Sequence, residues 1–198
     1  MSADEGCQAR KAEARHRLRE EARRHGEVER RTASEQLCGR LQARAEWIAA
    51  RYVLGFFPLP SEPDIRPVLE AALRDGKRLA LPRFRSGSGD YEPVEIRDLA
   101  QDLVPGAFGI REPADTCRVS SMNPLDLILV PGIGFDLAFG RLGRGKGHYD
   151  RLLAGTDAWV VGVGFDWQVE VAVPTEPHDI PLDFLVTPSR WLERLQVC

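Results

Sequence analysis

The chain has 198 residues and a formal net charge of −3, with 43% hydrophobic and 29% charged residues. This hydrophobic content excludes an intrinsically disordered protein, and the slight acidity argues against a dedicated nucleic-acid-binding protein, which usually has a large basic excess. At roughly 150 residues per domain, the length predicts a single domain over 1–198. No apolar run approaches the ~18 residues that a membrane-spanning helix needs.

The cysteines and the N-terminus predict a location. Four cysteines are scattered along the chain without any Cys-x-x-Cys pair, at Cys7, Cys38, Cys117 and Cys198. This spacing fits neither a zinc site nor a disulfide framework, and free thiols are typical of a reducing cytosol. The N-terminus lacks the apolar segment of a secretory signal. We therefore expect a cytoplasmic protein.

The first part of the chain predicts a basic helix over 1–31. Residues 9–31 are rich in Arg, Lys, Glu and Ala, and Leu18 and Val28 are nearly the only apolar residues among them. This composition favours a helix that has little to bury. The segment is either a solvated helix held by i,i+4 pairs or a cationic arm that lies over an anionic ligand.

Two further helices are predicted before the middle of the chain. Apolar side chains recur at the spacing of one buried helix face, at Leu37, Leu41, Ala45 and Ile48. A helix is also expected from about Asp64 to Asp75, because Gly76 favours the left-handed conformation that ends a helix.

Strands alternate with these helices. Short apolar or β-branched runs predict strands at 52–57, at 78–81 before Pro82, and at 126–131, 159–164 and 184–187. Residues 86–90 are typical of the turn in an antiparallel hairpin. The helix expected after Tyr149 joins two strands in a βαβ pattern. We therefore expect an α/β fold, a three-layer sandwich with a mostly parallel central sheet, N-terminal helices and a small hairpin insertion.

A glycine-rich cationic loop follows the most apolar strand. Six glycines lie within 132–147, and Arg141, Arg144 and Lys146 are interleaved with the last of them. Glycines let backbone N–H groups approach an anion, and cations beside a helix N-terminus complete a polyphosphate site. Asp150 could then hold the Mg²⁺ that accompanies a nucleotide, since Mg²⁺ is bound by one or two carboxylates together with phosphates.

Two common nucleotide-binding motifs are excluded. Residues 140–146 satisfy G-x-x-x-x-G-K, but Gly147 replaces the Ser or Thr of a P-loop, and the motif begins nine residues after its strand. The glycines at 143, 145 and 147 are spaced by two, which is not the G-x-G-x-x-G spacing of a dinucleotide-binding loop.

Several segments resemble one enzyme family. Residues 129–132 (Leu-Val-Pro-Gly), 134–136 (Gly-Phe-Asp) and 141–150 (Arg-Leu-Gly-Arg-Gly-Lys-Gly-His-Tyr-Asp) are similar to the motifs of 5-formyltetrahydrofolate cyclo-ligases. The resemblance extends over most of the chain, with His148 standing where the family usually has Tyr. It implies the ATP- and Mg²⁺-dependent conversion of 5-formyltetrahydrofolate to 5,10-methenyltetrahydrofolate, with release of ADP and phosphate through a phosphorylated formyl intermediate.

The resemblance also implies site residues. Catalysis would depend on Arg144 and Lys146, and Mg²⁺ would be held by Asp150 and Asp179. The folate would contact Phe57, Glu62 and the loop residues Arg144, Gly145, Lys146, Gly147 and His148. ATP would contact the N-terminal helix at Lys11 and Arg15, with Arg15 and Arg19 as the competing pair, and the stretch Arg141, Leu142, Gly143, Arg144, Gly145, Lys146, Gly147, His148 and Tyr149. His178 is expected to be a loop residue rather than a metal ligand, because no His/Cys metal spacing surrounds it.

The expected partners are therefore small molecules, ATP and the folate, bound by a monomer without membrane or nucleic acid. Three alternatives remain open: a non-catalytic relative that binds a folate or nucleotide, an RNA-binding protein that uses the basic helix, and a sugar-phosphate isomerase or CoA-transferase-like enzyme. A steep salt dependence of RNA affinity would support the second, and the last would need no ATP.

Overall fold

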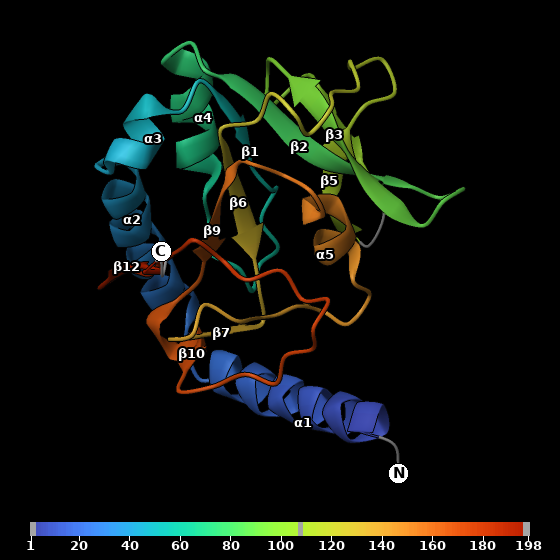
Figure 1. Ribbon diagram of the computed structural model, residues 1–198. Coiled ribbons are helices and arrows are strands. Elements are labelled where there is room, and N and C mark those ends of the chain that lie inside the picture. Colours follow the sequence, from blue (N-terminus) through green and yellow to red (C-terminus); the bar gives the residue numbers. More distant parts are fainter. Residues whose placement is uncertain (1–2, 107–108, 196–198) are drawn as a thin grey trace.

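A seven-stranded sheet in the order β12-β11-β9-β6-β1-β2-β3 forms the centre of the molecule (Figure 1), in a computed structural model that describes residues 3–106 and 109–195. Parallel pairing joins the five inner strands, β1 (Tyr52–Leu54), β2 (Arg78–Arg85), β6 (Leu127–Pro131), β9 (Trp159–Val163) and β11 (Phe184–Val186). The edge strands β3 (Asp90–Ile96) and β12 (Trp191–Glu193) pair antiparallel. The predicted mostly parallel sheet is confirmed.

Helices cover both faces of this sheet. Leu41 and Trp47 lie in the core on one face with Leu129, where the covering helices are α2 (Glu27–Gln42), α3 (Ala45–Ala49) and α4 (Arg66–Arg74). On the other face, Leu152 and Leu153 of α5 (His148–Leu153) pack in the cluster that contains Ile128 and Val130. Burial on both faces explains why β6 is apolar throughout. The three layers expected from the sequence are present.

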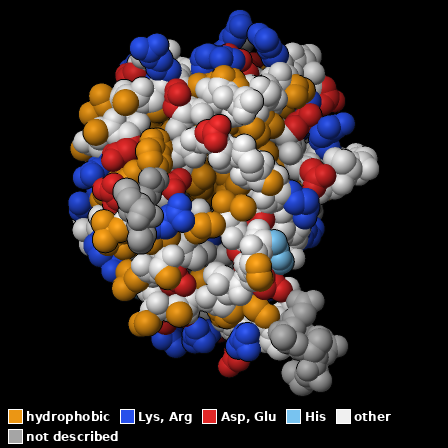
Figure 2. All heavy atoms as spheres, viewed as in Figure 1, with side chains coloured by type: hydrophobic (Ala, Val, Ile, Leu, Met, Phe, Trp, Pro, Cys, Tyr) orange, Lys and Arg blue, Asp and Glu red, His pale blue; other side chains and the backbone are white. Residues whose placement is uncertain are grey.

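The surface carries charges of both signs. On the face shown in Figure 2, Lys and Arg side chains are interspersed with Asp and Glu, so the described side chains form no single broad cationic area there. Proteins that bind nucleic acid usually have such an area. None of the described helices combines the length and the apolar composition needed to cross a membrane.

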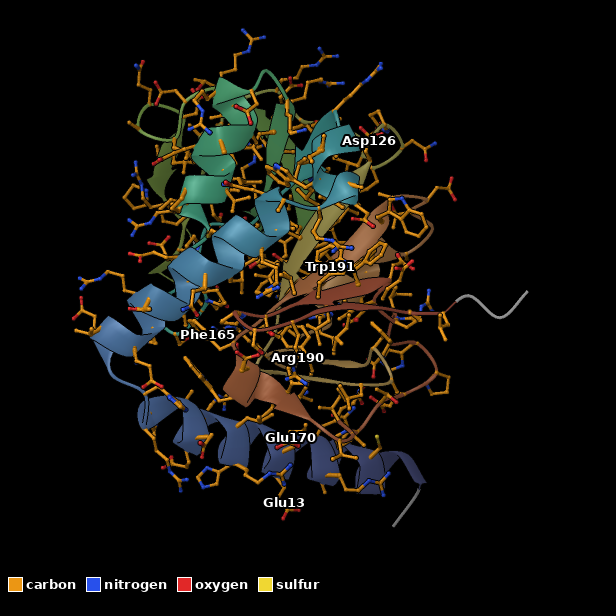
Figure 3. All side chains as sticks on the ribbon, turned by 90° about the vertical axis from the view of Figure 1, so that its left-hand side faces the viewer. Glu13, Asp126, Phe165, Glu170, Arg190 and Trp191 are labelled. Atoms are coloured by element: carbon orange, nitrogen blue, oxygen red, sulfur yellow. The ribbon has the colours of Figure 1, made fainter. Side chains whose placement is uncertain are left out.

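Helix α1 (Ala3–Arg23) lies outside the three layers and crosses one end of the molecule (Figure 1). It packs on a small sheet of β10 (Val169–Glu170), β7 (Gly134–Asp136) and β8 (Arg141–Leu142). Leu18 and Ala14 provide its buried contacts, in a cluster with Leu142 and Val173. Figure 3 shows Glu13 on the outer side of α1, while Glu170 on β10 faces the helix, where it pairs with Arg17. Two further short elements are η2 (Asp166–Gln168) and the pair β4 (Leu103–Pro105) and β5 (Arg111–Pro113).

The single basic helix predicted over 1–31 is wrong in its extent. Within the described residues the helix ends at Arg23, and a new helix begins at Glu27 after Gly26, whose backbone is extended. The break lets α1 lie against the small sheet while α2 covers the large one. No breaking signal stronger than this glycine separates the two basic segments in the sequence.

The buried face predicted for the second helix is only half correct. Leu37 and Leu41 are buried, but Ile48 is 67% exposed. The helix ends at Gln42, so the 3.6-residue period is lost, and the short α3 instead turns Trp47 into the core. Helix α4 and its terminal Gly76, with φ +75°, agree with the prediction.

Strand β2 continues past Pro82, contrary to the prediction that this proline ends it. Pro82 lies opposite Pro93 in β3. The carbonyl of Pro93 accepts the N–H of Ser120 at 2.8 Å, so its backbone polar groups point away from β2. The pairing of β2 with β3 therefore needs no backbone N–H from either proline at this point. A sheet tolerates proline where its nitrogen would not donate to the neighbouring strand. The predicted hairpin turn at 86–90 is present, and Gly89 has φ +74°.

Candidate active site

The carboxyl ends of the parallel strands open into a cleft of about 1140 Å³, which we call the site cleft. Four residues at these strand ends line it: Phe56 and Phe57 after β1, Pro131 as the last residue of β6, and Gly132 after it. Ligands of open α/β sheets bind at this edge. Helix α1 closes one side, so residues from both ends of the chain meet here.

The glycine-rich loop over 143–147 forms one wall of the site cleft. Gly145 has φ +98° and Gly147 has φ +64°, conformations that side chains with a Cβ rarely adopt. A Cβ on Gly145 would lie 3.3 Å from the guanidinium carbon of Arg15. Arg15 Nε also donates to the carbonyl of Gly143 at 2.9 Å. The loop is thus packed directly against the cationic face of α1.

Arg141 at the start of β8 is a buried cation in the cleft wall. Its side chain is 4% exposed and donates through Nη2 to Asp150 Oδ1 at 2.8 Å. Its Nε is buried and has no hydrogen-bond partner among the residues that the structure describes. A buried donor without an acceptor is costly, so a ligand oxygen at this position would satisfy it.

Lys11 of α1 joins two carboxylates of the loop between β10 and β11, on the opposite side of the cleft. Its Nζ lies 2.6 Å from both Glu176 and Asp179. Burial by itself lowers the pKa of Lys11, but the hydrogen bonds to Asp179 and Glu176 outweigh it, so the pKa is raised above its ordinary value. The ligand atoms of Glu176, His178 and Asp179 lie within 4.8 Å of one another. His178 therefore lies closer to a potential metal site than the sequence indicated.

Arg144 and Glu62 form an ion pair at the edge of the site cleft. Arg144 Nη2 donates to Glu62 Oε1 at 3.0 Å, and Glu62 Oε2 accepts the N–H of Leu59 at 3.0 Å. The side chain of Glu62 is buried, whereas that of Arg144 is 51% exposed. Glu62 is therefore fixed, and Arg144 has room to turn toward a ligand.

Aromatic rings fill the floor beside this pair. His148 makes edge contacts with Phe84 and Tyr91 at centroid distances of 5.5 and 5.1 Å, and Tyr91 is 6.0 Å from Tyr149. Burial, Arg151 and Lys146 lower the pKa of His148. Arg151 Nη2 lies 3.0 Å from His148 Nδ1; because a guanidinium only donates, this contact favours the neutral form of the ring.

The structure brings nearly all predicted site residues together. One cleft is lined by the predicted residues of α1, of the loop after β1 and, with one exception, of the glycine-rich loop. Asp150 and Asp179 line the same cleft. Lys146 does not line it; its side chain is exposed, and its carbonyl accepts from Arg151 at 3.1 Å. Arg19, the competing candidate on α1, lines a neighbouring cleft.

Several lining residues were missed by sequence reasoning. The most informative is Glu112 on β5, a buried carboxylate whose Oε2 accepts the N–H of Phe84 at 3.2 Å. Tyr91, Arg111 and Glu176 also face the site cleft. No periodicity or spacing distinguishes these residues. The family resemblance also covers Gly109-Ile110 and Glu112-Pro113, and it is the one sequence signal that points to Glu112.

Comparisons with known proteins agree with this geometry. The model of the 5-formyltetrahydrofolate cyclo-ligase family matches residues 7–188. The chain is 34% identical to the 5-formyltetrahydrofolate cyclo-ligase of Mycolicibacterium smegmatis, covering 75% of this chain and 79% of that protein. It is 32% identical to the Escherichia coli K12 protein of the same name, covering 79% and 88%.

A solved structure shows the same likeness. The NMR structure of Aquifex aeolicus 5,10-methenyltetrahydrofolate synthetase superposes with a TM-score of 0.83 at 33% sequence identity, covering 92% of each chain. Residues 7–188, which the family model matches, include most of α1, the glycine-rich loop and the parallel strands of the central sheet. The resemblance predicted from the sequence motifs is confirmed, and the chain belongs to the 5-formyltetrahydrofolate cyclo-ligase family.

Proposed function

We propose that the protein uses ATP and Mg²⁺ to cyclise 5-formyltetrahydrofolate to 5,10-methenyltetrahydrofolate, with release of ADP and phosphate. The observation that carries the proposal is the convergence of α1 cations on the glycine-rich loop. Arg15 contacts Gly143 and packs against Gly145, and Arg141 holds a buried N–H for which the described part of the chain provides no acceptor. Backbone amides and fixed cations at one position suit a polyphosphate.

The aromatic floor supports binding of the folate. A pterin is flat and has a hydrogen-bond donor edge. Phe57, Tyr91 and Tyr149 provide ring surfaces, and the buried carboxylates of Glu62 and Glu112 provide acceptors for that edge. Apolar walls with a few fixed polar groups are typical of small-molecule sites.

The carboxylates fit a magnesium ion that accompanies the nucleotide. Asp150 and Asp179 both line the site cleft, and carboxylate oxygens are the ligands that Mg²⁺ takes in proteins. In the structure, Asp150 forms an ion pair with Arg141, and Asp179 forms one with Lys11. Phosphate oxygens of ATP would compete for these cations. When bound, the metal would supply further neutralisation of the phosphate charge.

The chemistry then follows from charge and position. In the first step the formyl oxygen would attack the γ-phosphorus of ATP while the bond from that phosphorus to ADP breaks. In the second step the aryl amine nitrogen of the folate would attack the formyl carbon and lose its proton. Phosphate would then leave with the former formyl oxygen. Phosphoryl transfer depends on positioning and charge neutralisation rather than on a covalent nucleophile. Arg144, whose half-exposed side chain lines the site cleft, would pair with the transferred phosphoryl group, and Lys146 is two residues along the same loop.

The experiment that tests the proposal measures how much ADP is formed for each molecule of folate consumed. ADP formation is measured with ATP and Mg²⁺, with and without 5-formyltetrahydrofolate. We expect one ADP for each folate consumed and little ADP without the folate. Folate binding without ADP formation would instead support the non-catalytic alternative. The RNA-binding alternative is not favoured, because the face in Figure 2 mixes both charge signs and because Lys11 and Arg15 point into a small-molecule cleft.

A further inference from the structure

Asp136, the last residue of β7, has a buried carboxylate that joins two segments of the chain. Its Oδ1 accepts the N–H of Ala138 at 2.9 Å and that of Gly140 at 2.8 Å. Its Oδ2 accepts the N–H of Val173 at 2.8 Å, 37 positions further along the chain. Hydrogen bonds to a charged acceptor are roughly twice as strong as those between neutral groups. Asp136 therefore holds the two segments firmly together from behind the site cleft, which it does not line.

The first segment is a tight turn over 136–140, which we call the Asp136 turn. The N–H of Asp136 donates to the carbonyl of Gly140, and the N–H of Phe139 donates to the carbonyl of Asp136, both at 3.1 Å. Phe139 has φ +65° and is the one described residue other than glycine with a positive φ. Such a conformation is costly for a residue with a Cβ and persists only where the surrounding contacts impose it. The turn leads directly into Arg141, the buried cation of the cleft wall, so it fixes where β8 begins.

The second segment is the loop over 173–182, which carries Glu176 and Asp179 into the site cleft. The Asp136 turn holds this loop at both ends. At one end the N–H of Val173 donates to the carboxylate. At the other end the N–H of Leu182 donates to a backbone carbonyl of the turn at 2.9 Å. The two acidic residues therefore lie on a loop whose ends are both tied to one turn.

The turn and the loop are in close contact. A Cβ on Gly140 would lie 3.0 Å from Asp136 Oδ2 and also 3.0 Å from Thr175 Cγ2. The side chain of Val173 is buried in one cluster with Leu142, the residue that ends β8. Close-packed groups of this kind transmit a displacement to their neighbours. A shift of the turn would therefore move the loop that carries the two acidic residues.

We propose that Asp136 is a positioning residue for the nucleotide part of the site, because it sets the separation between Arg141 on one segment and Asp179 on the other. This inference rests on the proposed function, in which the phosphates and their Mg²⁺ contact these two side chains. Phosphoryl transfer depends on positioning, and a displacement of about 1 Å can lower the rate about 10²-fold. The folate contacts Phe57 and Glu62 belong to the loop after β1. Asp136 should therefore affect the nucleotide and not the folate.

Asp126 provides a matched control for a carboxylate that serves folding alone. Its Oδ2 accepts the N–H of Arg51 at 2.8 Å and that of Tyr52 at 2.9 Å. It stands just before β6, at the opposite edge of the sheet from the site cleft. Figure 3 shows it far from α1, near the other end of the molecule. Its replacement should lower stability as the replacement of Asp136 does, without moving the site.

The test compares Asp136→Asn with Asp126→Asn at a temperature where both variants are folded. An amide has one acceptor oxygen and a donor nitrogen in place of the second oxygen, so Asn can bond the turn or Val173 but not both. We measure Tm, kcat/KM for ATP, and by calorimetry the affinity for ATP with Mg²⁺ and the affinity for 5-formyltetrahydrofolate alone. In Asp136→Asn, kcat/KM for ATP should fall on the order of 10²-fold, ATP affinity should weaken and folate affinity should stay at the wild-type value. Asp126→Asn should lower Tm and leave the other three quantities unchanged.

Gly140→Ala tests the same separation without removing the carboxylate. The added methyl group would press on both Asp136 and Thr175, so it should force the turn and the loop apart. We expect a lower kcat/KM for ATP with an unchanged folate affinity. If Asp136→Asn does not fold, this second variant decides the inference.

Other outcomes would overturn the inference or separate it from the proposed function. A lower Tm in Asp136→Asn with wild-type kinetics and affinity for ATP would show that this carboxylate serves folding alone. Equal losses of ATP and folate affinity, or an equal loss of kcat/KM in Asp126→Asn, would also overturn it. A wild type that binds ATP but forms no ADP would contradict the proposed function alone, because the ATP affinities would still decide the role of Asp136. A wild type that binds no ATP would overturn both.

Discussion

Arg144 Nη2 donates to Glu62 Oε1 at 3.0 Å, although the two residues are separated by 82 positions in the chain. Each was predicted to contact a ligand, and in the structure each neutralises the other. The buried carboxylate of Glu62 keeps the half-exposed Arg144 next to the aromatic floor. A ligand that needs both groups must therefore reach this pair at the edge of the site cleft.

Arg144→Ala should reduce turnover far more than stability. Loss of one fixed cation from a phosphoryl-transfer site typically costs on the order of 10²–10³ in rate, whereas the ion pair of a half-exposed arginine contributes about 1 kcal/mol or less to folding. The measurements are kcat for the folate and the free energy of unfolding in urea. Arg24→Ala is the matched control and should affect neither. A variant that turns over at the wild-type rate would exclude Arg144 from the reaction.

Asp150→Asn should raise the Mg²⁺ concentration that half-saturates activity. It should also destabilise the fold by about 1.5–3 kcal/mol, since the hydrogen bond to the buried Arg141 loses its charge. The two effects are separated by titrating Mg²⁺ at a temperature where the variant is fully folded. An unchanged Mg²⁺ titration combined with lower stability would show that Asp150 serves only as the partner of Arg141.

Lys11→Gln should let Glu176 and Asp179 take up a divalent cation in the absence of ATP. In the wild type, the ammonium group of Lys11 lies 2.6 Å from both carboxylates and competes with a metal. Without that positive charge, two neighbouring carboxylates attract Mg²⁺ more strongly. Calorimetric titration with MgCl₂ alone should show tighter binding in this variant.

The control for that titration is Lys11→Gln combined with Asp179→Asn. This double variant removes the ammonium and one carboxylate together, so the gain in Mg²⁺ affinity should disappear. If the double variant binds Mg²⁺ as tightly as the single variant, the cation is held elsewhere and Asp179 is not a metal ligand.

His148→Tyr should make the protein less sensitive to acid. Burial, Arg151 and Lys146 lower the pKa of His148 in the folded protein below its ordinary value of 6.5. As the pH falls below about 6.5, the unfolded chain therefore takes up a proton before the folded one does. The contribution of His148 to the free energy of unfolding is complete above that pH and is lost as the pH falls through the folded pKa.

Thermal unfolding at pH 8 and pH 5 measures this effect. The difference in Tm between the two pH values should be larger for the wild type than for His148→Tyr, since tyrosine does not titrate in this range. His16, His25 and His178 are unchanged in both proteins, so they cancel in the comparison. An equal decrease in both proteins would show that His148 does not contribute.

The sequence predicted the strands and the glycine-rich loop because these signals are local. The apolar run of β6 and the turn at 86–90 carry their own patterns, and both are confirmed. The break at Gly26 and the turn of Trp47 into the core depend on what α1 and α2 pack against. Packing partners are distant in the sequence, so these features could not be predicted from the local pattern.

The site residues also divide into those that a local sequence signal predicts and those that depend on tertiary contacts. The loop residues and α1 cations were identified by motif and charge, and the structure brings them to one cleft. The ion pairs that join Lys11 to Asp179 and Arg144 to Glu62 span more than 80 residues each, and no spacing rule predicts which carboxylate meets which cation. Glu112 reaches the cleft because β5 packs beside β2, which is a tertiary contact.

The measurement that most directly tests the account is the near-ultraviolet absorbance of the methenyl product. Purified protein is mixed with 5-formyltetrahydrofolate and Mg²⁺, with and without ATP. The account predicts that the product band grows only when ATP is present and that Arg144→Ala suppresses it. A band that grows equally without ATP, or no band although calorimetry shows that both ligands bind, would contradict the proposed reaction.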